Sequence, residues 1–494
     1  LAVAAALAWP CAGGVAVASP EAVATPLPAR ASDWQGRISE MQGHRRGPMV
    51  SVWLRNNIRV HYMKMDVPPG TVWITINLAG GVMREDAGNR GISLVAAGAW
   101  DRASIRDVSK DELAIALEGK NVHFEGVAAA DAMCLRVWGS RGDIETGMQV
   151  ATLLLTRPQV GSEDVGKAAV RAGRDVWAER TMQGMIARSL ARALFPADEV
   201  RAHPAKREQV ETITPEQAQA WLDEHLRSAP IEAAIVGDLS LEQALELAGG
   251  FLGTLPERER IGPKTLASFR TVPAPKYPIV VEPATTRAAA GETDGDVLVL
   301  VGFAGPDVSR TRDVRSLRLA GEVLDDRVSR ALQLAGVLEP SSNSKGTSGK
   351  QAADAVGKKE REVAPSGDGS GSDSGSPTAW IAEQGRSPES QKANDATTVE
   401  VGVSVVPGTP YPGFGAVVVS CRVKAVKAAR AAEVIEREIA AAGSLGRLRS
   451  EELDQVRGEL VAKAEQANTD PRYWSAILAK TTTIGMDIDE AADV

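Results

Sequence analysis

Two stretches of this chain match each other at a spacing of 225 residues, and this repeat constrains the fold more than any other feature. Residues 72–104 read VWITINLAGGVMREDAGNRGISLVAAGAWDRAS, and residues 297–329 read VLVLVGFAGPDVSRTRDVRSLRLAGEVLDDRVS. A second pair, 162–170 and 450–458, matches at a spacing of 288. The spacings differ by 63 residues, about the length of a low-complexity stretch at 338–398. One unit that occurs twice, with an insert in the second copy, explains both spacings.

Each copy is predicted to run strands, helix, strands, helices. Residues 50–65 indicate two short strands around a tight Asn56-Asn57 turn, and 72–79 a third strand that Gly80-Gly81 ends. Apolar spacing predicts the remaining elements of the first copy, which are helices at 90–102, 143–155, 162–195, 214–228 and 240–252 and strands at 112–117, 121–128, 132–138 and 230–236.

The second copy is predicted to begin with a strand at 296–303 and a helix at 313–333. Residues 341–377 are too rich in Ser and Gly to bury a core, so an insert near 338–398 is expected to be disordered. The later predicted elements are strands at 398–406 and 415–423 and helices at 425–442, 450–467 and 471–481. The expected fold class is therefore α+β, with two similar units that each pack helices on a mostly antiparallel sheet.

The predicted domains are 49–256 and 294–494, joined by a Pro-rich linker at 257–293. Residues 1–48 are interpreted as a signal-like or linker segment, because 1–20 are rich in Ala, Val and Leu and precede a polar stretch. This interpretation predicts export to the periplasm or the outside of the cell. The alternative is an Ala-rich linker or helix of a larger protein. Pro10 and two glycines interrupt the apolar run, so no stable membrane span is expected.

Composition and cysteine content narrow the class of protein. A net charge of −8 without a long basic stretch, together with only 4% aromatic residues, argues against a nucleic-acid partner. The cysteines Cys11, Cys134 and Cys421 are odd in number and form no CxxC pair. A disulfide framework or a cysteine zinc site is therefore not expected, and Cys134 and Cys421 are predicted to be buried small apolar residues.

Several short motifs follow one another in order along the chain. They are LRNNIRV at 54–60, GGVMRE at 80–85 followed by Gly91, EQVETIT at 208–214, VGD at 236–238, FLGTL at 251–255 and DPRYW at 470–474. In this order, over residues 50–494, the motifs and the duplicated elements resemble the insulinase/pitrilysin family of zinc metallopeptidases. The resemblance implies the pitrilysin/LuxS-like metallohydrolase fold.

The family's catalysis requires an HxxEH motif, whose two histidines bind zinc while the Glu acts as general base. The matching positions here hold Leu94 and Gly98 in place of the histidines and Ala97 in place of the Glu. None of these residues can bind zinc or transfer a proton. The family's distal glutamate ligand would lie at 167–177, where this chain carries Arg171 and Arg174. A cation there would oppose a metal ion.

The second copy lacks the motif as well, since its corresponding positions hold Leu319, Glu322 and Val323. The five histidines of the chain show no helical metal-pair spacing; they are His44, His61, His123, His203 and His225. We therefore expect no metal ligands and no cofactor in this chain. Zinc is expected only in an upstream half or in a partner chain.

Arg330 is the one candidate for direct substrate contact that the resemblance supplies. The family's zinc-free half uses an Arg, and a Tyr seven residues later, to hold the substrate carbonyl and its developing negative charge. The Arg position maps onto Arg330, whereas the Tyr position maps onto Val337, where the insert begins. The alternative for Arg330 is a solvated cation near a helix end.

The resemblance implies a zinc-free half of a metalloendopeptidase that is inactive alone. Its partners would be an unfolded peptide, bound as an added edge strand, and a zinc-bearing half in the same or another polypeptide. The missing initial Met and the early end of the last helix suggest a fragment, whereas a true signal at 1–20 would indicate a separate exported subunit. Two alternatives stay open: a non-enzymatic scaffold or peptide-binding subunit of the same fold, and an unrelated α+β binding protein.

Overall fold

The structure is a computed structural model that describes residues 27–45, 47–178, 182–272, 296–338, 401–408, 411–443 and 450–491. The signal-like residues 1–20 and residues 339–398 of the predicted insert lie outside these ranges. Among the described helices, none combines the length and the apolar character that crossing a bilayer requires.

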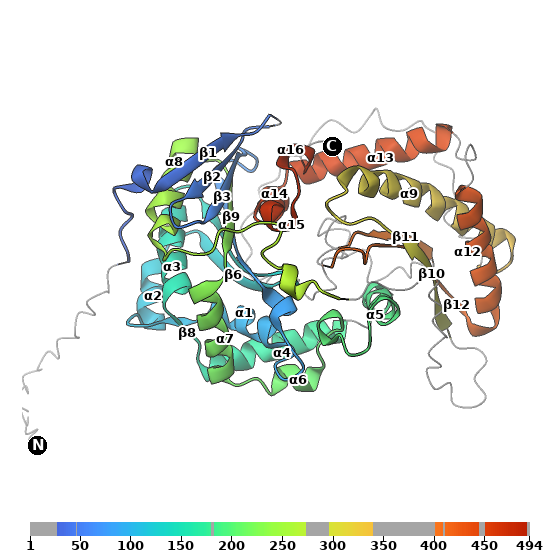
Figure 1. Ribbon diagram of the computed structural model, residues 1–494, viewed down its shortest axis with the longest axis horizontal. Helices are drawn as coiled ribbons and strands as arrows, with labels where there is room; N and C mark the ends of the chain where they lie inside the picture. The colour runs from blue at the N-terminus through green and yellow to red at the C-terminus, as the bar shows by residue number, and fades with distance from the viewer. Residues whose placement is uncertain are drawn as a thin grey trace, which may run out of the picture.

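A mixed seven-stranded sheet forms the larger part of the fold (Figure 1). Its strand order is β1-β2-β3-β9-β4-β7-β6. The strands span Ile38–Gly43 (β1), Met49–Leu54 (β2), Arg59–Lys64 (β3), Thr71–Ala79 (β4), Val122–Ala128 (β6), Ala132–Ser140 (β7) and Ile231–Gly237 (β9). Neighbouring strands are antiparallel except β3 and β9, which are parallel.

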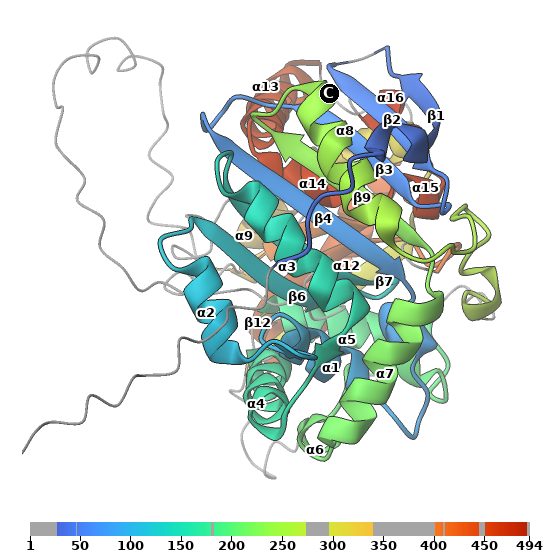
Figure 2. The ribbon, with the colours of Figure 1, turned by 90° about the vertical axis from the view of Figure 1, so that its left-hand side faces the viewer.

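Four helices cover one face of this sheet (Figure 2). They are α1 (Ile92–Trp100), α3 (Ile144–Thr156), α7 (Pro215–Ser228) and α8 (Leu241–Gly250). A fifth helix, α4 (Ser162–Ala178), packs against α1 on the side away from the sheet. Because α1 is enclosed in this way, every one of its residues except Leu94 is buried, and its sequence ISLVAAGAW is apolar almost all round.

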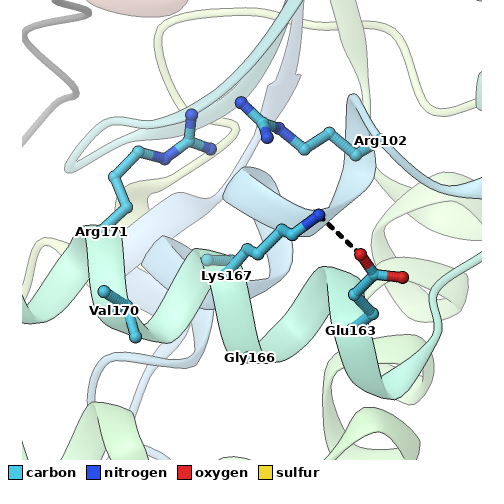
Figure 3. Close-up of a pocket in the computed structure, with 7 residues that line it drawn as sticks. Arg102, Glu163, Gly166, Lys167, Val170 and Arg171 are labelled. Atoms are coloured by element: carbon cyan, nitrogen blue, oxygen red, sulfur yellow. Dashed lines mark hydrogen bonds and ion pairs between the residues drawn. The ribbon is translucent and has the colours of Figure 1, made fainter.

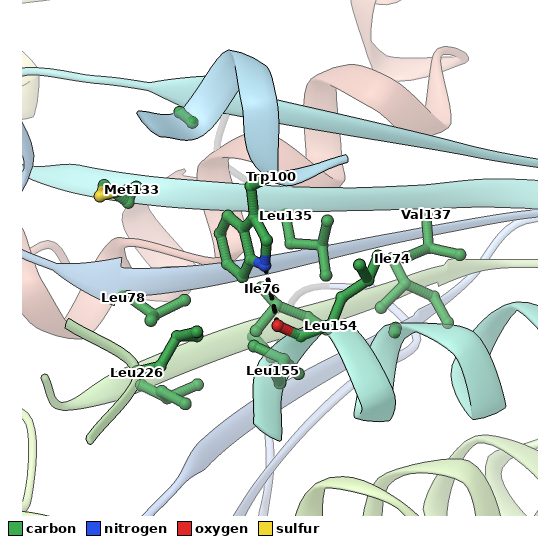
Figure 4. Packing of buried hydrophobic residues seen from close by; sticks show 14 of the residues in the cluster. Ile74, Ile76, Leu78, Trp100, Met133, Leu135, Val137, Leu154, Leu155 and Leu226 are labelled. Carbon is green, nitrogen blue, oxygen red and sulfur yellow. Dashed lines mark hydrogen bonds between the residues drawn. The ribbon is translucent and has the colours of Figure 1, made fainter. Parts of the chain in front are cut away.

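The main core lies between the sheet and these helices (Figure 4). Trp100 is fully buried there, and its indole N–H donates a hydrogen bond to the main-chain oxygen of Leu154 across 2.8 Å. A buried indole needs such an acceptor, because an unpaired N–H would forfeit its hydration. Around the ring lie Ile74, Ile76 and Leu78 of β4, Met133, Leu135 and Val137 of β7, and Leu155 and Leu226.

A smaller three-stranded antiparallel sheet has the order β10-β12-β11. Its strands are Asp296–Ala304 (β10), Val401–Val406 (β11) and Ala416–Lys424 (β12). The helices α9 (Thr311–Leu334) and α12 (Ala428–Ala442) pack on it, and α13 (Ser450–Asn468) packs against α9. A separate core holds this layer together; it includes Leu324, Val328, Leu332, Val419, Val434 and Ile435.

The last helices of the chain return to the larger sheet. These are α14 (Pro471–Leu478), α15 (Thr481–Ile484) and α16 (Ile488–Ala491), and α14 lies against β4 and β9 between the two sheets (Figure 1). Trp474 and Leu478 pack there with Met49, Ala234 and Val236. In the other direction, Phe195 stacks on Phe414 with 4.3 Å between ring centroids, just after α5 (Met182–Leu194). Each sheet region is therefore contacted by a segment from the other.

The structure corrects one secondary-structure prediction, since residues 112–117 are not a strand but part of α2 (Lys110–Leu117). The helix predicted at 162–195 corresponds to α4 and α5, and residues 179–181 between them lie outside the described part of the chain. β1 lies within residues 1–48, the segment interpreted as signal or linker. The remaining short elements are β5 (Ser104–Ile105), β8 (Pro158–Gln159), α6 (Arg207–Glu211) and 3-10 turns at Trp34–Arg37, Gly81–Arg84, Val200–Ala202, Leu252–Thr254, Ala267–Phe269 and Ala425–Lys427.

Candidate functional site

The positions that match the family's zinc motif lie on α1, next to α4. Ala97 and Gly98 are buried, and Leu94 packs against the main core. The start of α1 is fixed by Gly91, whose φ of 92° disfavours a side chain, and by Glu85, whose carboxylate accepts the main-chain N–H groups of Gly91 and Ser93 at 2.9 Å each. The helix is thus held firmly in place without any metal ligand on it.

Arg171 of α4 fills the space beside Gly98. Its Nη2 donates to the main-chain oxygen of Gly98 across 2.9 Å and lies 4.0 Å from Oδ2 of Asp101. A Cβ atom at position 98 would lie only 2.7 Å from this nitrogen. A histidine there would therefore have to displace the guanidinium. The side chain of Arg174, the other predicted cation, lies outside the described part of the chain.

Asp101 ends α1 and joins the helix to the edge strand β6. Its side chain is only 6% exposed, and Oδ2 accepts the main-chain N–H of Gly126 across 3.1 Å. Burial raises the pKa of Asp101 to about 6. A Cβ atom on Gly126 would lie 2.0 Å from the oxygen of Ala97, so only glycine allows β6 to approach α1 this closely.

An open depression of about 510 Å³ adjoins the degenerate motif (Figure 3). The side chains of Arg102 and Arg171 extend toward each other over α4, and Lys167 forms an ion pair with Glu163 across 2.6 Å. The wall consists of Arg102, Glu163, Gly166, Lys167, Ala168, Val170 and Arg171. Among the residues that the structure describes, no group of three or more His, Cys, Asp or Glu side chains lies close enough to hold a metal ion.

In the second sheet region, the corresponding motif positions hold no histidine, although Glu322 supplies a carboxylate. Val323 is buried, Leu319 is half-buried, and Glu322 is exposed 3.6 Å from Lys463 of α13. Nearby on α9, burial raises the pKa of Asp325 to about 6, although the main-chain N–H of Val403 hydrogen-bonds to its carboxylate and lowers the pKa somewhat.

The structure places Arg330 on the exposed side of α9, where its guanidinium lies 3.7 Å from Asp326. Val337, at the position of the family's Tyr, is buried against Leu332. The side chain of Arg330 is therefore exposed to solvent and does not pack in the core. Its contact with a substrate carbonyl stays a prediction.

A polar chain that sequence reasoning missed crosses the other face of the larger sheet, buried except at half-buried His44. His44 Nε2 lies 2.6 Å from Ser51 Oγ, Ser51 Oγ lies 2.7 Å from His61 Nδ1, and His61 Nε2 lies 3.0 Å from Glu232 Oε1. Glu232 stands in the apolar strand IEAAIVG. A lone carboxylate in a buried strand was the available signal, because such a group must find partners.

Comparison with known proteins supports the fold and the family. Residues 212–338 match the family described as the Peptidase M16 inactive domain. A solved M16 inactive domain from Pseudomonas fluorescens superposes with a TM-score of 0.60 at 12% identity, covering 90% of this chain and 90% of that chain. No curated protein sequence matches the chain significantly.

Two larger proteases share the fold as well. The periplasmic protease PqqL from Escherichia coli superposes with a TM-score of 0.59 at 13% identity, covering 92% of this chain and 42% of that chain. The ferredoxin protease FusC, solved with Arabidopsis ferredoxin, gives 0.54 at 12% identity, with 94% and 45% covered. This chain thus spans less than half the length of either protease. Residues 212–338 are therefore similar to the Peptidase M16 inactive domain, and the chain as a whole shares the fold of the solved M16 inactive domain.

Proposed function

We propose that this chain is the zinc-free half of an M16-type metalloendopeptidase and forms the peptide-binding chamber opposite a zinc-bearing half. One observation carries the proposal: α1 keeps its place against α4 in an M16-like fold, while Leu94, Ala97 and Gly98 replace the zinc motif and Arg171 fills the adjoining space. The scaffold of the metal site is kept and its chemistry is lost. Zinc would therefore come from an upstream half or a partner chain.

We also propose that the two sheet regions are copies of one unit. Strand order supports this, because β4-β7-β6 in one corresponds to β10-β12-β11 in the other. The helices follow in the same sequence, with α1, α3 and α4 in the first and α9, α12 and α13 in the second. α4 begins at Ser162 and α13 at Ser450, which is the spacing of 288 found in the sequence. The strands β1, β2, β3 and β9 have no described counterpart in the smaller sheet.

A buried aspartate lies at a similar place in each region, although at the spacing of 225 residues Asp101 matches Asp326 and not Asp325. Asp101 bonds to Gly126 of β6, and Asp325 bonds to Val403 of β11. Gly126 is paired with Leu135 of β7, and Val403 is paired with Val419 of β12. The two ladders can be aligned at the pairs Ala79–Ala132 and Ala304–Ala416. Leu135 then lies as many residues after Ala132 in β7 as Val419 lies after Ala416 in β12. In both regions, a carboxylate ties a helix to the edge strand.

The edge strands provide the means of binding peptide. Within the described residues, β6 forms a ladder only with β7, and β11 only with β12. Apart from the N–H groups of Gly126 and Val403, which the buried aspartates accept, each edge strand presents main-chain donors and acceptors along one side, which an extended peptide can pair with. We propose that an unfolded peptide adds to such an edge, and that Arg330 on α9 reaches the peptide from the second unit.

Export is part of the proposal. The signal-like composition of residues 1–20 supports it, and the structurally similar PqqL is described as periplasmic.

A cleavage assay tests the central claim. The chain alone should not hydrolyse an unfolded peptide, and adding a chelator should change nothing. Together with a zinc-bearing half encoded upstream in frame or in a neighbouring gene, it should support chelator-sensitive cleavage. Hydrolysis by the chain alone would refute the proposal. A stable complex with no effect on cleavage would instead support a scaffold.

A further inference from the structure

The depression beside the degenerate motif carries an excess of positive charge. Three cations line it, Arg102, Lys167 and Arg171, whereas Glu163 and the underlying Asp101 supply two carboxylates. With all five groups ionised, a net charge of +1 remains at one small open site. The net charge of the whole chain is −8, so this local excess runs against the general trend.

Arg171 is the fixed member of the group. Its side chain is only 24% exposed, and the contacts with Gly98 and Asp101 both use Nη2. A guanidinium carries five N–H donors in a rigid fork, and since Nη2 makes both of these contacts, Nη1 is the outer nitrogen that can meet an incoming carboxylate. The contacts with Gly98 and Asp101 hold the guanidinium in place before a ligand binds. This reduces the side-chain entropy that is lost on binding.

Arg102 and Lys167 are the more exposed members, and Arg102 Nε lies 3.7 Å from Asp101 Oδ1. The side chains of Arg102 and Lys167 are 56% and 59% exposed; Figure 3 shows Arg102 extending over α4 toward Arg171, and Lys167 extending toward Glu163, its ion-pair partner. The Lys167–Glu163 pair is exposed, and such pairs are weak, so an arriving carboxylate can replace Glu163 as the partner of Lys167. The exposed methyl groups of Val170 add an apolar surface at the rim, where the body of a peptide residue can rest.

We propose that this depression binds a carboxylate group of a peptide, held by Arg171 with Arg102 and Lys167 closing on it. The proposal rests on the proposed function, that the chain binds peptide, and names which group of the peptide is recognised. The carboxylate is either the C-terminus of the peptide or the side chain of an acidic residue.

Fluorescence anisotropy with the full chain tests the proposal. Three labelled versions of one extended peptide are compared: one with a single Glu and a free C-terminus, the same peptide amidated, and the same peptide with Gln in place of Glu. Loss of affinity on amidation identifies the C-terminal carboxylate, and loss with Gln identifies the side chain. Equal affinity of all three would overturn this inference and leave peptide binding intact. No binding of any of them would overturn the proposed function and this inference together.

Variants at the site localise the effect. The double change Arg102→Gln and Lys167→Gln should weaken binding of the carboxylate peptide by about tenfold, as expected from losing two exposed ionic contacts, and remove the preference over the neutral version. The change Glu163→Gln should strengthen binding, because it removes the competing carboxylate. Arg430→Gln with Arg437→Gln on α12 is the matched control, since both residues are exposed and the charge change is the same. An equal loss in this control would overturn the site assignment.

Discussion

Glu232 accepts a hydrogen bond from the main-chain N–H of Thr482 across 2.7 Å, although 250 residues separate them in the sequence. Its other oxygen accepts the N–H and the hydroxyl of Thr483 at 3.0 and 2.8 Å. The side chain is completely buried. Burial alone would raise the pKa of Glu232, but hydrogen bonds from His61 and Thr482 hold the pKa below its usual value. This carboxylate therefore fastens the C-terminal helices to the larger sheet.

The first prediction concerns this fastening. Glu232→Gln keeps the size of the side chain but places an amide NH2 against donors, so the free energy of unfolding should fall by about 3 kcal/mol. Urea unfolding measures the change. Glu145→Gln on α3, which is exposed, is the control and should stay within about 0.5 kcal/mol of the unchanged chain. A similarly small effect at Glu232 would show that the network does not stabilise the fold.

The depressed pKa of Glu232 also fixes the sign of its pH dependence. A carboxylate with a lowered folded-state pKa stabilises the fold above its unfolded-state value of 4.5, and this contribution is lost as the pH falls through the folded-state value. The difference in stability between the unchanged chain and Glu232→Gln should therefore shrink in acid. A difference that grows toward low pH would contradict the assigned hydrogen bonds.

Asp101 should show the opposite pH dependence. Because its pKa rises from 3.8 to about 6, the protonated form favours folding below the lower value, and this contribution is lost as the pH rises through the higher one. Asp101→Asn should have little effect near pH 4 and should stabilise the chain by up to about 3 kcal/mol near pH 8. Urea unfolding at the two pH values checks this. Asp326→Asn, at an exposed carboxylate, should show no such change between them.

A fourth prediction addresses the positions that match the family's zinc motif. Restoring the motif through Leu94→His, Ala97→Glu and Gly98→His should give weak zinc binding, because Arg171 occupies the space and repels the ion. Adding Arg171→Glu should raise the zinc affinity at least about tenfold. Competition with a chromogenic chelator measures both variants. Equal affinities would show that Arg171 does not block the site.

The unchanged chain provides a further test. Elemental analysis should find no stoichiometric zinc, and EDTA should leave the thermal unfolding midpoint unchanged, since a tightly bound metal would stabilise the folded state. One firmly held zinc ion per chain would refute the reading of Leu94, Ala97 and Gly98 as a lost motif.

Local sequence signals predicted several elements well. Thr214 followed by Pro215 indicated a helix start, and Thr214 indeed accepts the N–H of Gln217 at the beginning of α7. The strand prediction at 112–117 was wrong because a capping box decided the conformation: Ser109 and Glu112 bond to each other's main-chain N–H groups and start a helix. The helix cap therefore determined the conformation of this segment more strongly than the spacing of its apolar residues did.

The site was only partly predictable. Leu94, Ala97 and Gly98 can be read at the motif positions from the sequence, and Arg171 was expected near the distal ligand position; that the chain holds no zinc stays a prediction. The hydrogen bond of Arg171 to the Gly98 oxygen was not predictable. The sequence shows that Gly98 has no side chain, but it does not show which other residue occupies the space that this leaves. Glu232 was missed for a related reason: its partners lie at the far end of the chain and only the folded structure brings them together.

The exchange of segments between the two sheet regions has a consequence for how the molecule comes apart. α14 lies on the larger sheet, and Phe195 stacks on Phe414 beside the smaller one, so each region holds a piece of the other's chain. A single cut of the backbone between residues 272 and 296 would leave two fragments that stay in contact through α14 on the larger sheet and through the Phe195–Phe414 stack. Separating the fragments would expose Trp474 and Leu478 together with the Phe195–Phe414 stack, so these contacts couple the stability of the two sheet regions.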